Sequence, residues 1–144
     1  MAMKVVFFLI PKSEVVCLKS QTTMRQALER MERHGYSAVP LVDENGRYAG
    51  TVTEGDLLWK LKSSPGLDLG GMEKIPVSEI ATHAQNRPVR IDARIVDLLS
   101  LASEQNFVPV VDDQDIFIGI VRRREIIEYC SKLIRDAEKV KSKE

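Results

Sequence analysis

Apolar residues occur at helical spacing in two stretches of the chain that occupy corresponding places in a repeated pattern. Both stretches follow the i, i+3, i+4, i+7 spacing of a helix with one apolar face. We therefore predict two amphipathic helices, one in each half of the chain. The first face consists of Met24, Ala27, Leu28 and Met31, and the second consists of Ile95, Leu98, Leu99 and Ala102.

A β-hairpin is predicted directly after each of these helices. Residues 39–52 read VPLVDENGRYAGTV and residues 108–121 read VPVVDDQDIFIGIV, and the two segments align without a gap. Each segment is a short apolar run, an acidic turn and a second run that begins near glycine. The first turn carries Asn-Gly, which is a strong hairpin signal. The two segments indicate an internal repeat.

Helix ends and a second pair of helices complete the repeat. Thr23 and Gln26 have the spacing of a capping box, Gly35 is the expected C-terminal stop, and Asp92 is the expected N-cap of the second-copy helix. Downstream of the hairpins, apolar stripes predict one further helix in each copy. These stripes are Leu57, Leu58 and Leu61 in the first copy, and Ile126, Ile127, Cys130, Leu133 and Ile134 in the second.

The repeat unit is thus strand, helix, strand, strand, helix, which predicts an α+β fold. We assign residues 1–62 to the first repeat, 63–74 to a linker, 75–134 to the second repeat and 135–144 to a charged tail that is expected to fray. One unit alone buries too little surface to be stable. The two units are therefore expected to pack face to face through their sheets as one pseudo-symmetric body.

Composition excludes several classes of function. The chain has 144 residues, 44% of them hydrophobic, and its 21 basic residues balance its 21 acidic ones. This neutral balance argues against a nucleic-acid partner. The longest apolar run, residues 5–10, is too short to span a membrane, which favours a cytoplasmic protein without a membrane partner. Cys17 and Cys130 are too far apart for a zinc pair or a disulfide framework, and both are expected in the core.

The sequence also argues against catalysis. It contains neither a phosphate-binding loop of the Gly-x-x-x-x-Gly-Lys-[Ser/Thr] type nor a Gly-x-Ser-x-Gly elbow. His34 and His83 have no partner at helical spacing that would complete a zinc site or a triad with Cys17, so both are expected on the surface. We predict that the protein is not an enzyme and that it has no cofactor and no metal.

The tandem units carry a recognisable motif. Residues 50–56 read GTVTEGD, which fits the pattern Gly-x-x-[Ser/Thr]-x-x-[Asp/Asn], and residues 119–125 read GIVRRRE, with Arg122 in the hydroxyl position and Glu125 in the acid position. With this motif, residues 5–62 and 75–134 resemble a pair of CBS domains, the module named after cystathionine β-synthase. The resemblance implies two clefts that bind adenosine-containing ligands, and association of two pairs into a flat dimer.

Thr53 and Asp56 are the candidate ligand residues of the first motif. The helix start around them offers unpaired N–H groups for a phosphate, while the Asp56 carboxylate would accept hydrogen bonds from ribose and Thr53 would donate to phosphate or ribose. Thr-x-x-Asp is also the signature of an ordinary capping box that binds no ligand. The family resemblance favours the ligand interpretation, and the capping interpretation stays open.

The resemblance further implies a slot for the base, formed by the leading segment and the proline-containing strand. Tyr36 would stack on adenine, and the small Ser37 and Ala38 would let backbone amides reach its edge, or Tyr36 lies half-exposed at a helix end. The residues expected to line the slot are Lys12, Ser13, Glu14, Val15, Tyr36, Ser37, Ala38 and Pro40, with Arg87, Pro88, Val89, Asn106, Phe107 and Pro109 as the second-copy counterparts.

Three consecutive arginines distinguish the second motif. Arg122 in place of a hydroxyl residue favours contact with phosphate over contact with sugar, so the second pocket is expected to be altered, blocked or restricted to phosphate. Arg122, Arg123 and Arg124 would also reach across the pseudo-dyad to the phosphates of a nucleotide held by Thr53 and Asp56. The alternative for each arginine is a solvated side chain paired with glutamate.

These expectations together describe a regulatory ligand-sensing module. Its ligand is expected to be an adenine nucleotide, AMP, ADP or ATP, bound in the cleft between the repeats, and its signal a conformational change. The alternatives are a cyclic di-AMP receptor and a ligand-free oligomerisation module. A homodimer and a regulated partner protein are the expected macromolecular contacts.

Overall fold

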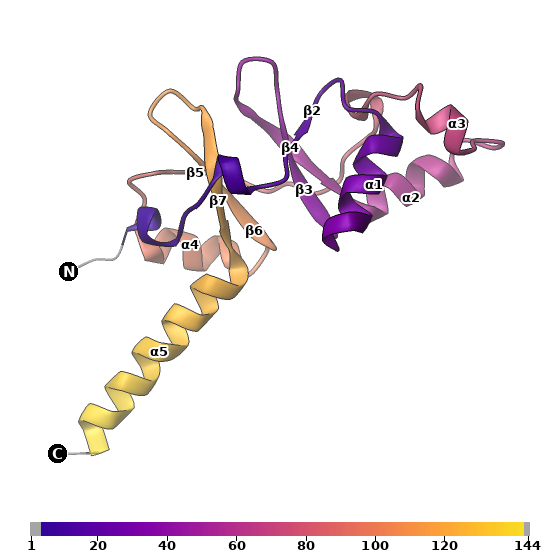
Figure 1. Cartoon of the computed structure of the whole chain (residues 1–144). Coiled ribbons are helices and arrows are strands. Elements are labelled where there is room, and N and C mark those ends of the chain that lie inside the picture. Colours follow the sequence, from indigo (N-terminus) through magenta and orange to yellow (C-terminus); the bar gives the residue numbers. More distant parts are fainter. Residues whose placement is uncertain (1–3, 143–144) are drawn as a thin grey trace.

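Two copies of a strand, helix, strand, strand, helix unit are arranged side by side in the structure, a computed structural model that describes residues 4–142 (Figure 1). The first unit consists of β2 (Leu18–Lys19), α1 (Met24–His34), β3 (Ala38–Val42), β4 (Tyr48–Thr53) and α2 (Glu54–Lys62). The second consists of β5 (Val89–Arg90), α4 (Ile95–Ala102), β6 (Phe107–Val111), β7 (Phe117–Arg122) and α5 (Arg123–Ser142). The other elements are β1 (Ile10–Pro11), α3 (Leu69–Met72) and three short 3-10 turns, Val5–Phe8, Lys12–Glu14 and Val77–Glu79.

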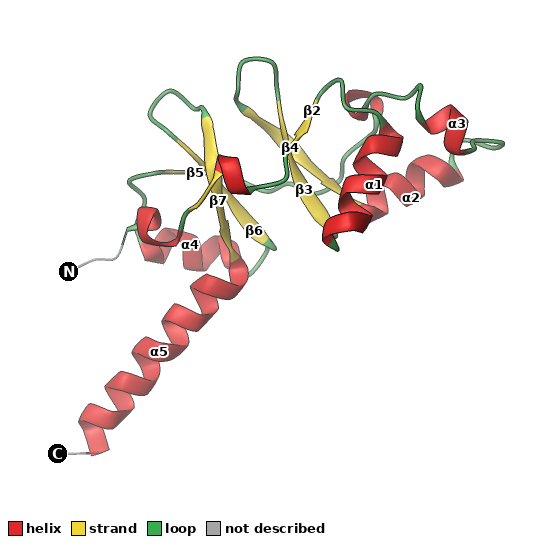
Figure 2. Cartoon of the chain, in the orientation of Figure 1, coloured by secondary structure: helices red, strands yellow, loops and turns green. Residues whose placement is uncertain are grey.

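The predicted α+β class and the repeat are confirmed by the sheets. The first sheet has the strand order β2-β3-β4 and the second has the order β1-β7-β6-β5. The sheets lie in the middle of the molecule, with helices on the outside of each (Figure 2). A cluster of side chains from both sheets fills the space between them, as face-to-face packing predicts, and it includes Val42, Phe107, Phe117 and Ile120.

Each repeat also receives a segment that precedes the other repeat. Val5 is fully buried in the second-repeat core, and β1 pairs with β7 through Ile10 and Ile120. A side chain at Gly119 would collide with the carbonyl oxygen of Ile10, so glycine is required where β1 crosses β7. Conversely, Met72, Val77 and Ile80 pack into the first-repeat core. The segments ahead of the two repeats therefore tie the halves together.

Most local signals in the sequence are confirmed. Thr23 and Gln26 form a reciprocal capping box on α1, and Gly35 ends that helix in the left-handed conformation with φ 67°. The predicted hairpins are present as β3–β4 and β6–β7. In their turns, Asp43 and Asp112 accept backbone N–H groups two and four residues further on, which fixes both turns in the same way.

Three predictions at helix ends and in the linker need correction. Arg94, not Asp92, is the N-cap of α4, because Asp97 accepts the Arg94 backbone N–H at 3.0 Å and so closes the first turn. The tail predicted to fray is helical up to Ser142, as a run of alanine, lysine and glutamate favours once a helix is nucleated. The segment predicted as a linker, residues 63–74, contains the short helix α3.

Several residues predicted to face the core are exposed instead. On α2, α4 and α5, part of each apolar stripe faces solvent. Leu57, Leu98 and Ile126 on the same helices are buried. The exposed residues are Leu58, Leu99, Ile127, Leu133 and Ile134. Cys17 and Cys130 are half-buried rather than fully enclosed. Among residues 4–142, no helix is long and apolar enough to cross a membrane.

Candidate functional site

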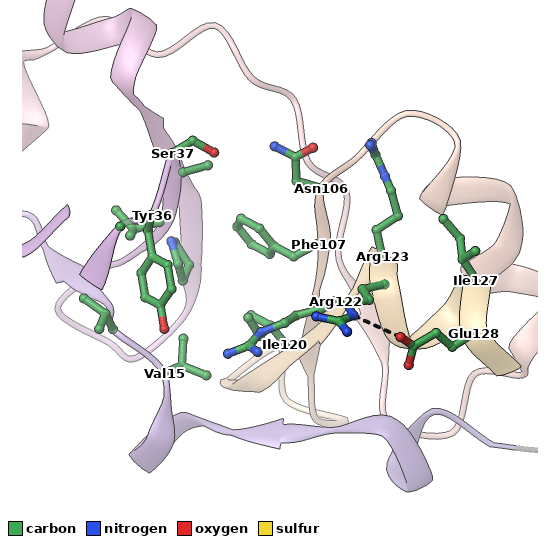
Figure 3. A pocket seen from close by; sticks show the side chains of 16 residues that line it. Val15, Tyr36, Ser37, Asn106, Phe107, Ile120, Arg122, Arg123, Ile127 and Glu128 are labelled. Atoms are coloured by element: carbon green, nitrogen blue, oxygen red, sulfur yellow. Dashed lines mark hydrogen bonds and ion pairs between the residues drawn. The ribbon is translucent and has the colours of Figure 1, made fainter. Parts of the chain in front are cut away.

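The main cavity of the molecule lies between the two repeats and has a volume of about 700 Å³. This volume is within the usual range for small-molecule sites. The first repeat contributes the segment just after α1 and the start of β3, and the second contributes β6, the end of β7 and the start of α5 (Figure 3). The lining residues are Val15, Val16, Gly35, Tyr36, Ser37, Ala38, Val39, Pro40, Asn106, Phe107, Ile120, Arg122, Arg123, Arg124, Ile127 and Glu128.

The first-repeat wall of the main cavity contains Val15, Tyr36, Ser37, Ala38 and Pro40 from the set of residues predicted for the base slot. Tyr36 is half-buried at the end of α1, and its ring lies 5.5 Å from that of His34 in a stacked arrangement. Figure 3 shows the Tyr36 and Phe107 rings pointing into the space between the repeats. Ser37 and Ala38, whose side chains are small, line the same wall. An apolar slot with aromatic faces suits a flat heterocycle.

Lys12 and Ser13 do not line the main cavity, contrary to the prediction. Together with Glu14 they form an exposed 3-10 turn, and the chain reaches the cavity only at Val15 and Val16. The charge of Lys12 acts elsewhere, since it opposes the rise in the pKa of the Cys17 thiol that burial produces. Pro40 lies on the lining, as predicted.

The second-repeat wall is cationic. Arg122 ends β7, and Arg123 and Arg124 begin α5, a place where backbone N–H groups and the helix dipole favour an anion. The Arg123 Nε atom donates to the Gln105 carbonyl at 2.8 Å, and Arg124 pairs with Glu128 at 2.9 Å. The hydrogen bond with Glu128, reinforced by its charge, raises the pKa of the Arg124 guanidinium.

Arg122 differs from its neighbours because it is exposed and has no salt-bridge partner within residues 4–142. Its guanidinium is therefore available for a phosphate, whereas Arg123 is held by the backbone and Arg124 by a glutamate. Glu125, in the acid position of the motif, has a buried carboxylate oxygen, Oε2, without a hydrogen-bond partner in the protein. Buried acceptors of this kind are normally hydrogen-bonded.

Thr53 and Asp56 form a capping box and do not line the main cavity. The Asp56 N–H donates to Thr53 Oγ1 at 3.2 Å, and the Thr53 N–H donates to Asp56 Oδ2 at 2.9 Å. Asp56 Oδ1 accepts the His83 backbone N–H at 3.1 Å and lies 2.8 Å from His83 Nδ1. With its side chain only 1% exposed, Asp56 has no free face for a ribose.

The predicted grouping of Thr53 and Asp56 with the slot around Tyr36 is therefore wrong. The pseudo-twofold arrangement of the repeats places each motif opposite the slot of the other repeat. The arginine-containing motif of the second repeat thus faces Tyr36, and the first motif faces the second-repeat segment around His83. Arg122, Arg123 and Arg124 line the same cavity as Tyr36, and Thr53 and Asp56 are absent from that lining.

Comparison with known proteins identifies the family. The sequence pattern of the CBS domain matches residues 9–63 and again residues 77–132. The chain belongs to the CBS domain family. Its two matches cover nearly all of the two repeats described above.

The similarity of this CBS protein to several relatives extends over most of the length of both chains. Cyclic di-AMP receptor B from Bacillus subtilis (strain 168) is 24% identical over 132 residues, which are 92% of this chain and 89% of that protein. The crystal structure of CbpB in complex with c-di-AMP has a TM-score of 0.79 at 22% identity, covering 96% of this chain and 91% of the other. The crystal structure of CBSX2 in complex with AMP has a TM-score of 0.68 at 25% identity, covering 90% and 97%.

Some enzymes also match this CBS protein, but over a small part of their length. L-aspartate semialdehyde sulfurtransferase from Methanosarcina acetivorans is 21% identical over 119 residues, which are 82% of this chain and only 22% of that protein. The similarity therefore lies in one portion of a longer enzyme. Among the described residues, no group of three or more His, Cys, Asp or Glu side chains is arranged to hold a metal ion.

The pseudo-symmetric counterpart of the main cavity has different side chains in this CBS protein. Gln105 occupies the position of Tyr36 and is 3% exposed. Its side chain accepts the Arg87 N–H at 2.8 Å and donates to the carbonyls of Arg87 and Phe107, both at 3.2 Å. Phe107 stands where the first repeat has Ala38, and His83 covers Asp56. A cavity of about 450 Å³ remains beside Gln105, but its lining residues, Ala84–Arg87, Glu104 and Gln105, all belong to the second repeat.

Sequence reasoning missed the residues whose role depends on long-range packing. Val16 and Glu128 line the main cavity from outside any motif, and Ile120 lies within the second motif at a position to which no ligand role was assigned. Glu128 had a usable signal, because it follows Arg124 at the i, i+4 spacing of a helical ion pair. His83 had none, since its contact with Asp56 joins residues far apart in the sequence. Both histidines are exposed, as predicted.

Proposed function

We propose that this CBS protein is a regulatory module that senses an adenine nucleotide in the main cavity. One observation carries the proposal: an apolar slot beside Tyr36 faces the cationic start of α5 across a cavity of about 700 Å³. A base and a phosphate need these two environments at opposite ends of one site. The c-di-AMP and AMP complexes of structurally similar CBS proteins support a nucleotide as the ligand.

Different lining residues bind the base and the phosphate of the ligand. The base stacks on Tyr36 and lies against Phe107, with its edge next to Ser37 and Ala38. The phosphate is bound by Arg122 and by the N–H groups at the start of α5. AMP, ADP and ATP share these features, and cyclic di-AMP is the alternative ligand, favoured by the similarity to cyclic di-AMP receptor B.

Signalling follows from the position of the cavity between two repeats. A ligand shifts an equilibrium between two arrangements only by binding one of them more tightly. A nucleotide that contacts Tyr36 on one repeat and Arg122 on the other favours the arrangement in which the two walls are close together. We propose that this closure regulates a partner protein, without catalysis by the CBS protein itself.

A homodimer is the proposed assembly. Apolar side chains remain exposed on the outer helices, and those on α5 continue beyond the part of the helix that packs on the second repeat (Figure 1). Exposed apolar side chains that gather on one helix are candidate positions for a protein contact, and α5 carries the largest number of them. The residues concerned are Leu58 and Trp59 on α2, Val96 and Leu99 on α4, and Ile127, Leu133, Ile134 and Val140 on α5. A module that only oligomerises would not need the main cavity, so the ligand-binding function is favoured.

A thermal-shift screen tests the proposal. The wild-type protein is heated with AMP, ADP, ATP and cyclic di-AMP, and a ligand at 100 times its Kd is expected to add about 2.7 kcal/mol of stability. Tyr36→Ala and Arg122→Gln should reduce the shift, whereas Arg135→Gln, an exposed arginine on α5, should not. No shift with any of the nucleotides, or an unchanged shift in Arg122→Gln, would contradict the proposal.

A further inference from the structure

A second cavity, of about 420 Å³, adjoins the main cavity and has no role in the function proposed so far. Val15 and Val16 line both cavities, so the two spaces lie on either side of the same short segment. The opposite wall of the second cavity is the side of α1 that carries Arg30, Arg33 and His34. Residues three and four apart on a helix project on the same face, which brings these three side chains together.

The second cavity is cationic and largely uncompensated. Arg30 and Arg33 are exposed, and neither has a carboxylate at salt-bridge distance within residues 4–142. The one carboxylate among its described lining residues, Glu29, is already bonded to Arg25 at 3.2 Å. The charge of Lys12 reaches the same region, because it acts on the Cys17 thiol, another lining residue.

This clustering is not a consequence of overall charge. The chain carries equal numbers of basic and acidic residues, 21 of each, yet Arg122 on one side of Val15 and Arg30 and Arg33 on the other all lack an acidic partner in the described part of the chain. Unpaired arginines around an open space bind phosphate oxygens well, because each guanidinium offers several donors in a fixed plane.

Tyr36 connects the two cavities. Its ring lies in the main cavity, and it stacks on His34, which lines the second cavity, with ring centroids 5.5 Å apart and planes inclined by 16°. A ligand that stacks on Tyr36 therefore lies next to the opening of the second cavity. Arg122 lines the same cavity as the Tyr36 ring, and Arg30 and Arg33 line the cavity on the His34 side of that ring.

We propose that Arg30 and Arg33 form a second anion subsite, and that the ligand is a nucleotide with two phosphate groups separated by at least one ribose. The first phosphate is bound at Arg122 and the start of α5, and the second is bound by the two α1 arginines. The inference rests on the proposed function, since the main cavity must hold the base and the first phosphate. A contiguous polyphosphate, as in ATP, has all its phosphates on one side of the ribose and so does not offer two phosphate positions separated by a ribose.

The test compares ligands with one and two phosphate positions. Isothermal titration measures binding of AMP, adenosine 3′,5′-bisphosphate and cyclic di-AMP to wild type, to the R30Q/R33Q double variant and to a K139Q/K141Q control, which removes two exposed charges at the end of α5. Unfolding curves are recorded for each variant, and because all four substituted residues are exposed, we expect their melting temperatures to agree with that of wild type.

For R30Q/R33Q, the affinity for at least one of the two-phosphate ligands should fall about tenfold or more, the effect of losing charge-assisted hydrogen bonds, while the AMP affinity stays within about twofold. The control should bind all three ligands like wild type. The subsite is overturned if nucleotides bind but R30Q/R33Q leaves both two-phosphate ligands unaffected, or weakens AMP to the same degree. If none of the three binds to wild type, the proposed function itself fails, and the subsite with it.

Discussion

Replacement of Asp56 by alanine separates the two roles that its sequence motif suggests. The Asp56 carboxylate accepts the Thr53 N–H at 2.9 Å and the His83 N–H at 3.1 Å, and it contacts the His83 ring at 2.8 Å. Loss of a capping side chain costs about 1 kcal/mol. The two contacts with His83 are worth roughly 1–2 kcal/mol more, because water replaces part of what is lost.

We therefore expect Asp56→Ala to lower the free energy of unfolding by about 2–3 kcal/mol, which corresponds to a fall in Tm of about 6–12 °C for a chain of this size. Thermal and urea unfolding measure this loss. Asp92→Ala is the matched control, since Asp92 is an exposed aspartate that does not cap its helix, and its effect should stay below about 0.5 kcal/mol.

The same Asp56→Ala protein should bind nucleotide with the affinity of wild type at a temperature where both are folded. Asp56 is buried away from the main cavity, so its removal leaves Tyr36 and Arg122 in place. A variant of unchanged stability and reduced nucleotide affinity would refute this reasoning, and would show that the carboxylate binds the ligand rather than the His83 segment.

Four further outcomes follow from particular contacts. His83→Ala removes a ring contact of 2.8 Å and should lower stability by about 1 kcal/mol in urea unfolding, and a more stable variant would contradict this. Glu128→Ala frees Arg124, paired at 2.9 Å, so nucleotide affinity at low salt should rise several-fold in a titration rather than fall. Ile134→Glu puts a charge on the exposed face of α5, and light scattering should show a smaller species than the dimer we propose for the wild type. Burial raises the pKa of the Cys17 thiol, so iodoacetamide should label it more slowly at pH 8 than a free cysteine peptide, and faster labelling would argue against that burial.

Local structure was largely predictable from the sequence because its causes are local. The Asn-Gly turn, the Thr23 capping box and Gly35 act within a few residues, and each is found where its pattern predicts. The repeat itself predicted the α+β fold and the packing of one sheet against the other. The start of α4 was predicted at the wrong residue, because Asp97 closes the first turn from inside the helix and makes Arg94, which is not a typical capping residue, the N-cap.

The candidate site was predictable in its parts but not in its grouping. Tyr36 and Arg122 lie in one cavity, whereas Thr53 and Asp56 do not share it, because the partner of each motif comes from the other repeat. The spacing of residues along the chain does not show that each motif is paired with a segment of the other repeat. A Thr-x-x-Asp sequence reads the same whether its carboxylate meets a ribose or a histidine from a distant loop.

Outward-facing apolar residues show a second limit of pattern analysis. Leu98 and Leu99 are adjacent on α4 and equally apolar, yet Leu98 is fully buried and Leu99 is exposed. Helical periodicity predicts that an apolar stripe exists, but it does not predict how much of the stripe a neighbouring element covers. The uncovered part is the surface at which we propose a second copy of the chain.

The central claim is that a nucleotide binds between the Tyr36 slot and the start of α5, and a crystal structure of the protein with AMP or cyclic di-AMP tests it most directly. We predict a base stacked on Tyr36, a phosphate within hydrogen-bond distance of Arg122, and an intact contact between His83 and Asp56. A nucleotide whose ribose is bound by Asp56, with His83 displaced and the main cavity empty, would contradict the account.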